Sequence, residues 1–228
     1  MLLSFPNWII HISSALEWGI GALLIFRYGT LTGRREIRLF GIAMLPHWVG
    51  SFFVLGYHVS TDSIPLLLDM SEVINFFGSI SLLWATLNLL KTTKKTQTAG
   101  YTAAVAAIVF AGKPQSYMGA DIFDTILQLS SIVYMTFLVL LIVLYRRDRT
   151  VFSALTVAGF WFVLVFISVT VFCIYLATDV CGFPSLSHDD LLHGLAESLL
   201  TVSNLMIAFG AHRKIREFKA EQLLNNQG

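Results

Sequence analysis

The feature of this sequence that most suggests chemistry is a stripe of polar side chains near its C-terminal end. The stripe consists of Asp190, His193, Glu197, Thr201 and Asn204. These residues are three or four positions apart, so they lie on one face of an α-helix. Histidine and glutamate inside a membrane are the side chains of proton relays and ion pathways. We therefore predict a ligand-binding or coupling face on this helix.

Three other apolar segments carry side chains of the same types. Each of the segments 5–27, 37–57 and 65–90 carries at least one such side chain. In the second of these segments a histidine follows Pro46, whose missing N–H frees a backbone carbonyl that a side chain can satisfy. The predicted ligand-binding or coupling residues are His11, Ser14, Glu17, His47, Glu72, Asn75, His193, Glu197, Thr201 and Asn204.

Three functions would use such residues. A small-molecule or ion carrier would use the carboxylates and histidines as coupling groups, and this is the function we favour. The alternative is a metal-dependent membrane enzyme, because three nitrogen or oxygen ligands and an open position suit zinc or iron. Its predicted ligands are His11, His47, His193 and Glu197. The third is a photosynthetic assembly protein, or a pigment- or quinone-binding protein, with a histidine as axial ligand. The residues identify no cofactor.

Composition sets the class of the protein. The chain has 228 residues, of which 56% are hydrophobic and 13% charged, and its mean hydropathy is +0.72. These values indicate an all-α, polytopic membrane protein in a lipid bilayer. The net charge is only +1, with the basic residues gathered in short clusters, whereas a nucleic-acid-binding protein needs a broad basic face.

Segment length predicts the number of membrane spans. A spanning helix needs roughly 20 mostly apolar residues. Six segments satisfy this requirement, at about 5–27, 37–57, 65–90, 123–145, 150–177 and 190–211. A seventh, alanine-rich stretch within residues 91–121 is shorter, and the distribution of charge decides its case.

Basic residues favour seven spans over six. Lys and Arg cluster after the first and third spans, at 146–149 and at 212–219. Because cytoplasmic loops are rich in Lys and Arg, all clusters should lie on one side. Only seven spans achieve this, with the N-terminus outside and the C-terminus inside. Residues 213–228 then form a polar cytoplasmic tail.

An internal similarity predicts a duplicated architecture. When residues 8–28 are placed over residues 125–145, seven of the 21 positions are identical, including a shared Ser-Ser and a final Tyr. We predict a parallel 3+1+3 bundle, with one three-helix unit over residues 1–90, a linker with a short fourth helix over 91–121 and a second unit over 122–212. Such repeats are a known carrier architecture, with binding sites at the repeat interface.

The predicted topology also places the polar residues by depth. The ionisable residues gather in the outer half of the spans, which predicts a vestibule that opens outward. Histidines at the ends of predicted helices, namely His58, His188 and His212, are expected on the surface. A simpler interpretation is that the buried polar residues only hold helices together by hydrogen bonds.

Four stretches resemble a known group of proteins. "SFPNWIIHISSALEW" and "RYGTLTGRREIR" lie in the first half, and "DTILQLSSIVY" and "LLHGLAESLLTVSNLMIAFG" lie in the second. They resemble uncharacterised membrane proteins of cyanobacteria and plastids: a conserved hypothetical plastid reading-frame family, and a second uncharacterised domain. The resemblance implies a thylakoid or plasma membrane and photosynthetic-membrane protein partners, but no substrate.

Overall fold

The computed structural model describes residues 3–93 and 120–226, which are helical apart from short connections. The α-helices are α1 (Phe5–Leu31), α2 (Arg35–Ala43), α3 (Leu45–Val59), α4 (Pro65–Thr92), α5 (Ala120–Arg147), α6 (Ala154–Tyr175) and α7 (Asp190–Asn225). A π-helical turn (Leu176–Val180) and a 3-10 turn (Leu186–His188) precede α7. No strand occurs in the described ranges, so the predicted all-α class is confirmed.

Six helical stretches of the described residues are long and apolar enough to cross a membrane. They match the six clear predicted spans, with α2 and α3 together forming the second, Arg35–Val59. The helix α7 is longer than its predicted span, because it continues through the polar tail to Asn225. The predicted short fourth helix falls largely on residues 94–119, outside the described residues, so the count of seven spans stays a prediction.

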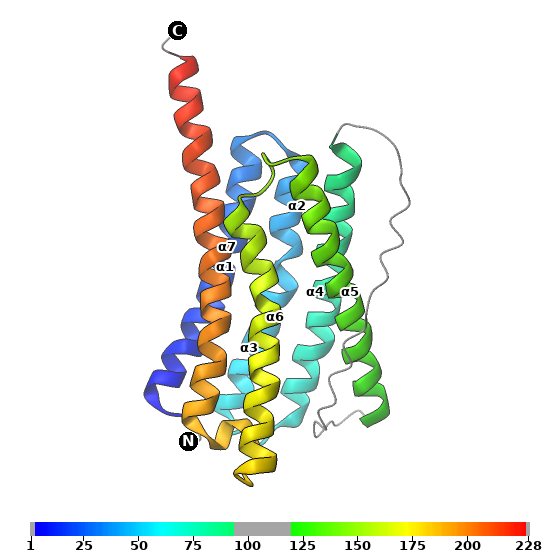
Figure 1. The fold of residues 1–228 in the computed structure, drawn as a ribbon, viewed down its shortest axis with the longest axis vertical. Helices are drawn as coiled ribbons and strands as arrows, with labels where there is room; N and C mark the ends of the chain where they lie inside the picture. Colours follow the sequence, from blue (N-terminus) through cyan, green and yellow to red (C-terminus); the bar gives the residue numbers. More distant parts are fainter. Residues whose placement is uncertain (1–2, 94–119, 227–228) are drawn as a thin grey trace.

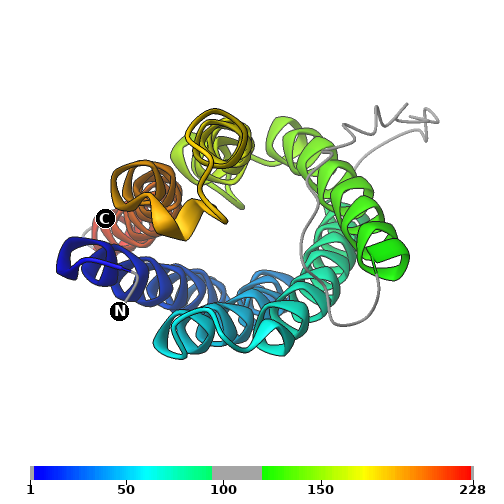
Figure 2. The same cartoon turned by 90° about the horizontal axis from the view of Figure 1, so that it is seen from below.

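The helices form one closed ring. Each helix contacts the next along the chain, and α7 returns to pack against α1, as the end-on view shows (Figure 2). The helices α1, α4, α5 and α7 run in one direction, whereas α2, α3 and α6 run in the other (Figure 1). Corresponding helices of the two predicted three-helix units therefore run the same way: α1 with α5, α2 and α3 with α6, and α4 with α7. This is what a parallel duplication requires, although the duplication itself stays a prediction.

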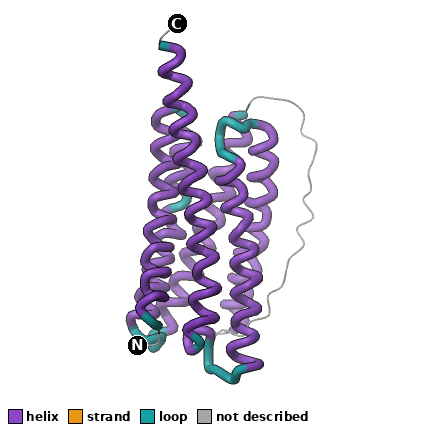
Figure 3. Tube along the Cα trace, turned by 60° about the vertical axis from the view of Figure 1, so that its left-hand side comes forward, coloured by secondary structure: helices purple, strands orange, loops and turns teal. Residues whose placement is uncertain are grey.

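The two ends of the ring differ in charge. The described connections lie at the ends of the bundle, apart from the break between α2 and α3 (Figure 3). The connections 32–34 and 148–153 and the C-terminal part of α7 share one end (Figure 1). These segments and the adjoining helix ends carry arginines and lysines, so we call this the basic end. The opposite end holds the start of α1 and the connections 60–64 and 181–189, and we call it the N-terminal end.

The half of the ring next to the basic end has an apolar core. Its largest buried side chains include Phe40, Phe137 and Phe160, from α2, α5 and α6. The ring centroids of Phe137 and Phe160 lie 5.3 Å apart, and those of Phe40 and Phe160 lie 5.9 Å apart. Both pairs are edge-to-face, the geometry that aromatic quadrupoles favour. Most of the buried polar side chains instead lie toward the N-terminal end of the bundle, on α1, α3, α4 and α7, whereas Ser153 and Thr156 are buried at the basic end.

The break between α2 and α3 has an identifiable cause. Pro46 lies in the first turn of α3 and has no N–H, so the helix cannot continue its hydrogen bonds there. The hydroxyl of Ser81 donates to the Ala43 carbonyl at 2.6 Å, and the indole of Trp18 donates to the Met44 carbonyl at 2.9 Å. Side chains of neighbouring helices thus satisfy the carbonyls at the break, as expected in lipid.

Polar contacts join two connections at the basic end. The Arg34 guanidinium contacts the Asp148 carboxylate at 3.0 Å, and the Tyr28 hydroxyl donates to the Thr150 carbonyl at 2.6 Å. Burial raises the pKa of Asp148, but hydrogen bonds from Thr150 and the charge of Arg34 outweigh burial, so this pKa lies below its ordinary value. The first and second halves of the chain are thereby held together at this end.

The contact of α6 with α7 leads to a prediction about stability. A methyl group at Gly210 would lie 2.5 Å from the backbone nitrogen of Thr156, whereas one at Gly56 would meet only the Leu67 side chain, at 3.5 Å. We expect Gly210→Ala to lower the stability by about 1–3 kcal/mol, because overpacking separates the helices. Gly56→Ala, also in a helix, should leave stability unchanged or slightly raised. Thermal unfolding in detergent measures both. Equal unfolding temperatures for the two variants would contradict the close α6–α7 contact.

Candidate functional site

A polar seam between α1 and α7 begins at the N-terminal end. The Asn7 side-chain amide donates to the backbone carbonyl and to the carboxylate of Asp190, both at 2.7 Å. The backbone N–H of Ser4 donates to the same carboxylate at 2.8 Å. A side chain at Gly194 would collide with the Asn7 amide, so glycine lets the two helices approach here. The start of the last helix is therefore fixed against the start of the first.

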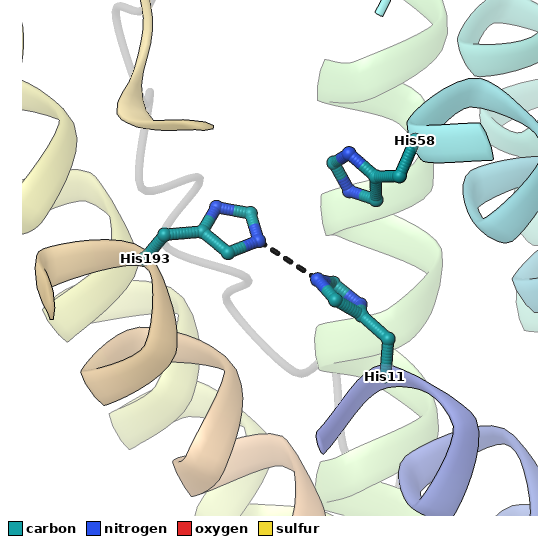
Figure 4. A group of neighbouring side chains, drawn as sticks. All are labelled: His11, His58 and His193. Atoms are coloured by element: carbon teal, nitrogen blue, oxygen red, sulfur yellow. Dashed lines mark hydrogen bonds between the residues drawn. The ribbon is translucent and has the colours of Figure 1, made fainter. Parts of the chain in front are cut away.

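The next layer of this seam is a histidine cluster, which we define as His11, His58 and His193 (Figure 4). The three residues come from α1, α3 and α7, and all three are buried. One ring nitrogen of each lies within 4.8 Å of the corresponding nitrogen of the other two. The Nε2 atoms of His11 and His193 are 2.7 Å apart. Three imidazoles from three helices thus point at a common space.

The short contact between His11 and His193 restricts their protonation. Two protonated imidazoles would each present an N–H at Nε2, and two donors cannot form a hydrogen bond with each other. At least one of the two rings is therefore neutral, and its Nε2 lone pair accepts the hydrogen bond from the other ring. A neutral imidazole nitrogen is the form of histidine that binds a metal.

Two carboxylates stand next to the histidine cluster. Asp62 Oδ1 lies 2.9 Å from His58 Nδ1, and Glu197 Oε2 lies 3.8 Å from His11 Nδ1. Burial raises the pKa of Asp62, but the side chains of His58 and Ser187 outweigh burial, so this pKa lies below its ordinary value. A carboxylate on one ring nitrogen fixes the tautomer and leaves the other nitrogen free to coordinate.

The position of His58 corrects the expectation that it lies on the surface. His58 is only 8% exposed. After it the chain turns through Thr61 and Asp62, both in the left-handed region, with φ of 56° and 58°. This turn brings the Asp62 carboxylate back onto the imidazole. Position at a helix end suggested exposure, but the tight turn and the closure of the ring bury the side chain. His188 and His212 are exposed as predicted.

A second group of predicted residues lies further along α1 and α7. The Asn204 amide donates to the backbone carbonyl and to the hydroxyl of Ser14, at 2.9 and 3.0 Å. Three buried oxygens have no hydrogen-bond partner among the described residues: Glu17 Oε2, Thr201 Oγ1 and Asn204 Oδ1. These side chains are held in the interior with unused hydrogen-bonding capacity.

The predicted residues of α3 and α4, namely His47, Glu72 and Asn75, lie outside the histidine cluster. The His47 ring lies 5.6 Å from that of Trp18 and packs closely against Gly78. The Asn75 amide donates to the Ser71 hydroxyl at 3.3 Å, and Glu72 is half-buried on the same helix. Among the described residues, His47 is not part of the histidine cluster, which contains His58 instead.

Comparison with known proteins gives two family matches. Residues 2–88 match a family described as a protein of unknown function (DUF2499), and residues 123–216 match another with the same description (DUF3593). A "Ycf49-like protein" of Synechocystis sp. is 29% identical over 82 residues, which are 35% of this chain and 79% of the relative. These matches support an uncharacterised cyanobacterial and plastid family with two domains. No solved structure matches the chain.

The burial of the histidine cluster predicts its chemical reactivity. We expect diethylpyrocarbonate to modify His188 and His212 quickly in the folded protein, because both are exposed. His11, His58 and His193 should react at least about tenfold more slowly, since reaction requires local opening. Peptide mass spectrometry after brief labelling measures the rates. Modification of His58 as fast as that of His188 would contradict its buried position, and labelling in denaturant provides the control for intrinsic reactivity.

Proposed function

We propose that this two-domain membrane protein is a metalloprotein that holds a divalent metal ion of the zinc class on His11, His58 and His193. The observation that supports this is the convergence of three buried imidazole nitrogens within 4.8 Å of one another. Three histidines with an open fourth position are a ligand set of catalytic zinc sites. The metal-dependent enzyme, predicted from the sequence as the alternative, thus becomes the first choice, with His58 in the place of His47.

The distances in the cluster are compatible with metal binding after a small movement. Nitrogen ligands bind zinc at about 2.0–2.1 Å, so two ligands of a tetrahedral site are roughly 3.3 Å apart. The two Nε2 atoms of His11 and His193, now 2.7 Å apart, would separate by about half an ångström. The third nitrogen would move inward.

The neighbouring carboxylates fit the outer partners of such a centre. Asp62 contacts the Nδ1 atom of His58, so that His58 can use Nε2 as a ligand. Glu197 lies beside the Nδ1 atom of His11, so it would orient His11 with Nε2 as the ligand atom. We infer that a metal ion held here would supply the chemistry of hydrolysis, because three histidines leave one coordination position open.

The position of the cluster suggests which side of the membrane its substrate comes from. The cluster lies near the N-terminal end, and the apolar core lies between it and the basic end. Under the positive-inside rule the basic end faces the cytoplasm. The substrate would then reach the metal from the non-cytoplasmic side.

A second candidate function is the carrier. It is favoured by the unpaired buried polar atoms Glu17 Oε2, His47 Nδ1, Thr201 Oγ1 and Asn204 Oδ1. Unpaired polar atoms in a membrane interior are unfavourable, and a polar solute or ion that passes them would supply their missing partners. In this case the histidine cluster is the outer binding site of a transport path through the membrane, and Glu72 and Asn75 lie along this transport path.

The metal proposal predicts a defined stoichiometry. Protein purified without chelators should contain about one zinc or similar ion per chain, as measured by elemental mass spectrometry. His58→Ala and His193→Ala should lose it. Asp62→Asn should weaken binding about 10- to 100-fold in a chelator competition, as removal of outer partners does. His188→Ala is the control and should keep the metal. A metal-free wild type that also fails to take up added zinc would refute the proposal.

Binding and uptake distinguish the two candidate functions. The fluorescence of a zinc chelator enclosed in proteoliposomes measures zinc uptake. The zinc bound to the protein in the same preparation measures binding. The metalloenzyme should bind zinc without uptake above that of protein-free vesicles. If zinc does enter, and Glu17→Gln or Thr201→Ala slows entry while the bound zinc is unchanged, the carrier is correct and the enzyme is not.

A further inference from the structure

A hollow at the basic end lies between the start of α6 and the C-terminal part of α7. It has a volume of about 600 Å³ and is lined by Leu155, Phe209, His212, Arg213 and Arg216, among others. A smaller hollow of about 210 Å³ adjoins it and shares Arg213 with it. We call the two together the basic groove. It lies on the far side of the apolar core from the histidine cluster, so it belongs to neither candidate function.

The charge of the basic groove is only partly compensated. Glu217 pairs with Arg213 at 2.8 Å and with Lys214 at 3.1 Å. Arg216 and His212 are exposed and have no ion pair among the described residues. Arg149 lies over the Tyr145 ring, 5.7 Å from its centre, which leaves its charge uncompensated. One carboxylate therefore faces four permanent positive charges, and the groove complements an anion.

The wall of the groove toward the membrane is apolar. Phe209 is 61% exposed and Leu155 is 36% exposed, one on each of the two helices. The basic residues follow Phe209 on α7 within two turns, at the point where the apolar span gives way to the polar extension. The groove thus places positive charge next to an exposed apolar surface at the expected depth of the lipid headgroups.

The start of α6 adds to this attraction. Ser153 caps the helix by accepting a hydrogen bond from the Thr156 N–H, and it lines the smaller hollow. The N-terminus of a helix carries a partial positive charge that favours a nearby anion. This contribution accompanies the arginines and would not make a site without them.

We propose that the basic groove binds an anionic lipid of the surrounding leaflet. The headgroup phosphate contacts Arg216, His212 and Arg213, and an acyl chain lies against Phe209 and Leu155. Basic pockets between membrane helices are known to hold anionic headgroups. A soluble anion would use only the charges, whereas a lipid uses both the charges and the exposed apolar wall.

Native mass spectrometry of the full chain tests the proposal. Protein is reconstituted in nanodiscs of phosphatidylcholine with increasing phosphatidylglycerol, and the lipid retained after release is identified. Wild type should keep one phosphatidylglycerol. The double variant Arg216→Gln/His212→Gln should bind it at least roughly fivefold more weakly, as expected for removing one arginine near anionic lipid. Phe209→Ser should also weaken retention, through loss of the chain contact.

Matched variants exclude a general effect of charge. Arg35→Gln/Lys219→Gln removes exposed basic residues at the same end but outside the groove, and it should retain the lipid as wild type does. Equal loss in this control would mean diffuse attraction to the membrane surface and would overturn the proposal. Displacement of the lipid by inorganic phosphate, or unchanged retention in Phe209→Ser, would indicate a site for a soluble anion instead. Unchanged circular dichroism shows that each variant is folded.

Discussion

The contact between the first helix and the last is the interaction on which the rest of this structure depends. Both α1 and α7 carry a polar face that lipid cannot solvate, so the two faces have to pair with each other. They meet through Asn7 with Asp190, His11 with His193, and Ser14 with Asn204. Each such hydrogen bond contributes only about 0.6 kcal/mol on average in a membrane. Together they determine which helices are neighbours, because any other arrangement exposes these groups to hydrocarbon.

Closure of the ring by α1 and α7 also divides its interior into two environments. The half toward the basic end is filled by phenylalanines and aliphatic side chains, with Phe40, Phe137 and Phe160 in mutual contact. The half toward the N-terminal end holds the histidine cluster and most of the buried amides and hydroxyls. An apolar layer on one side of a polar centre excludes water and ions from that side. Electrostatic interactions inside the polar half are correspondingly stronger than in water.

The helical spacing of the polar residues predicts which of them share a face of one helix. Contacts between residues of different helices depend on how the helices pack, which the spacing does not give. The spacing of His193, Glu197 and Asn204 predicted a common face of α7, and the structure turns that face toward the interior. No spacing connects His58 to His11, because they lie on different helices and meet only when α3 packs against α1. His47 shares the residue type and the span of His58. The two histidines are 11 residues apart, about three helical turns, so they lie on nearly the same face but roughly 16 Å apart along the helix. His47 therefore contacts Trp18 and Gly78 instead.

The histidine cluster draws on both matched segments of the chain. His11 and His58, with Asp62, lie within residues 2–88, whereas His193 and Glu197 lie within residues 123–216. Neither segment by itself supplies three nitrogen ligands from the described cluster. Two ligands alone bind a metal ion weakly and leave several positions open, whereas three fix its geometry and leave one. Under the metal proposal, the ring must close before the three histidines meet, which gives a physical reason for joining the two matched segments in one chain. The α1–α7 seam that closes the ring also brings His193 to His11.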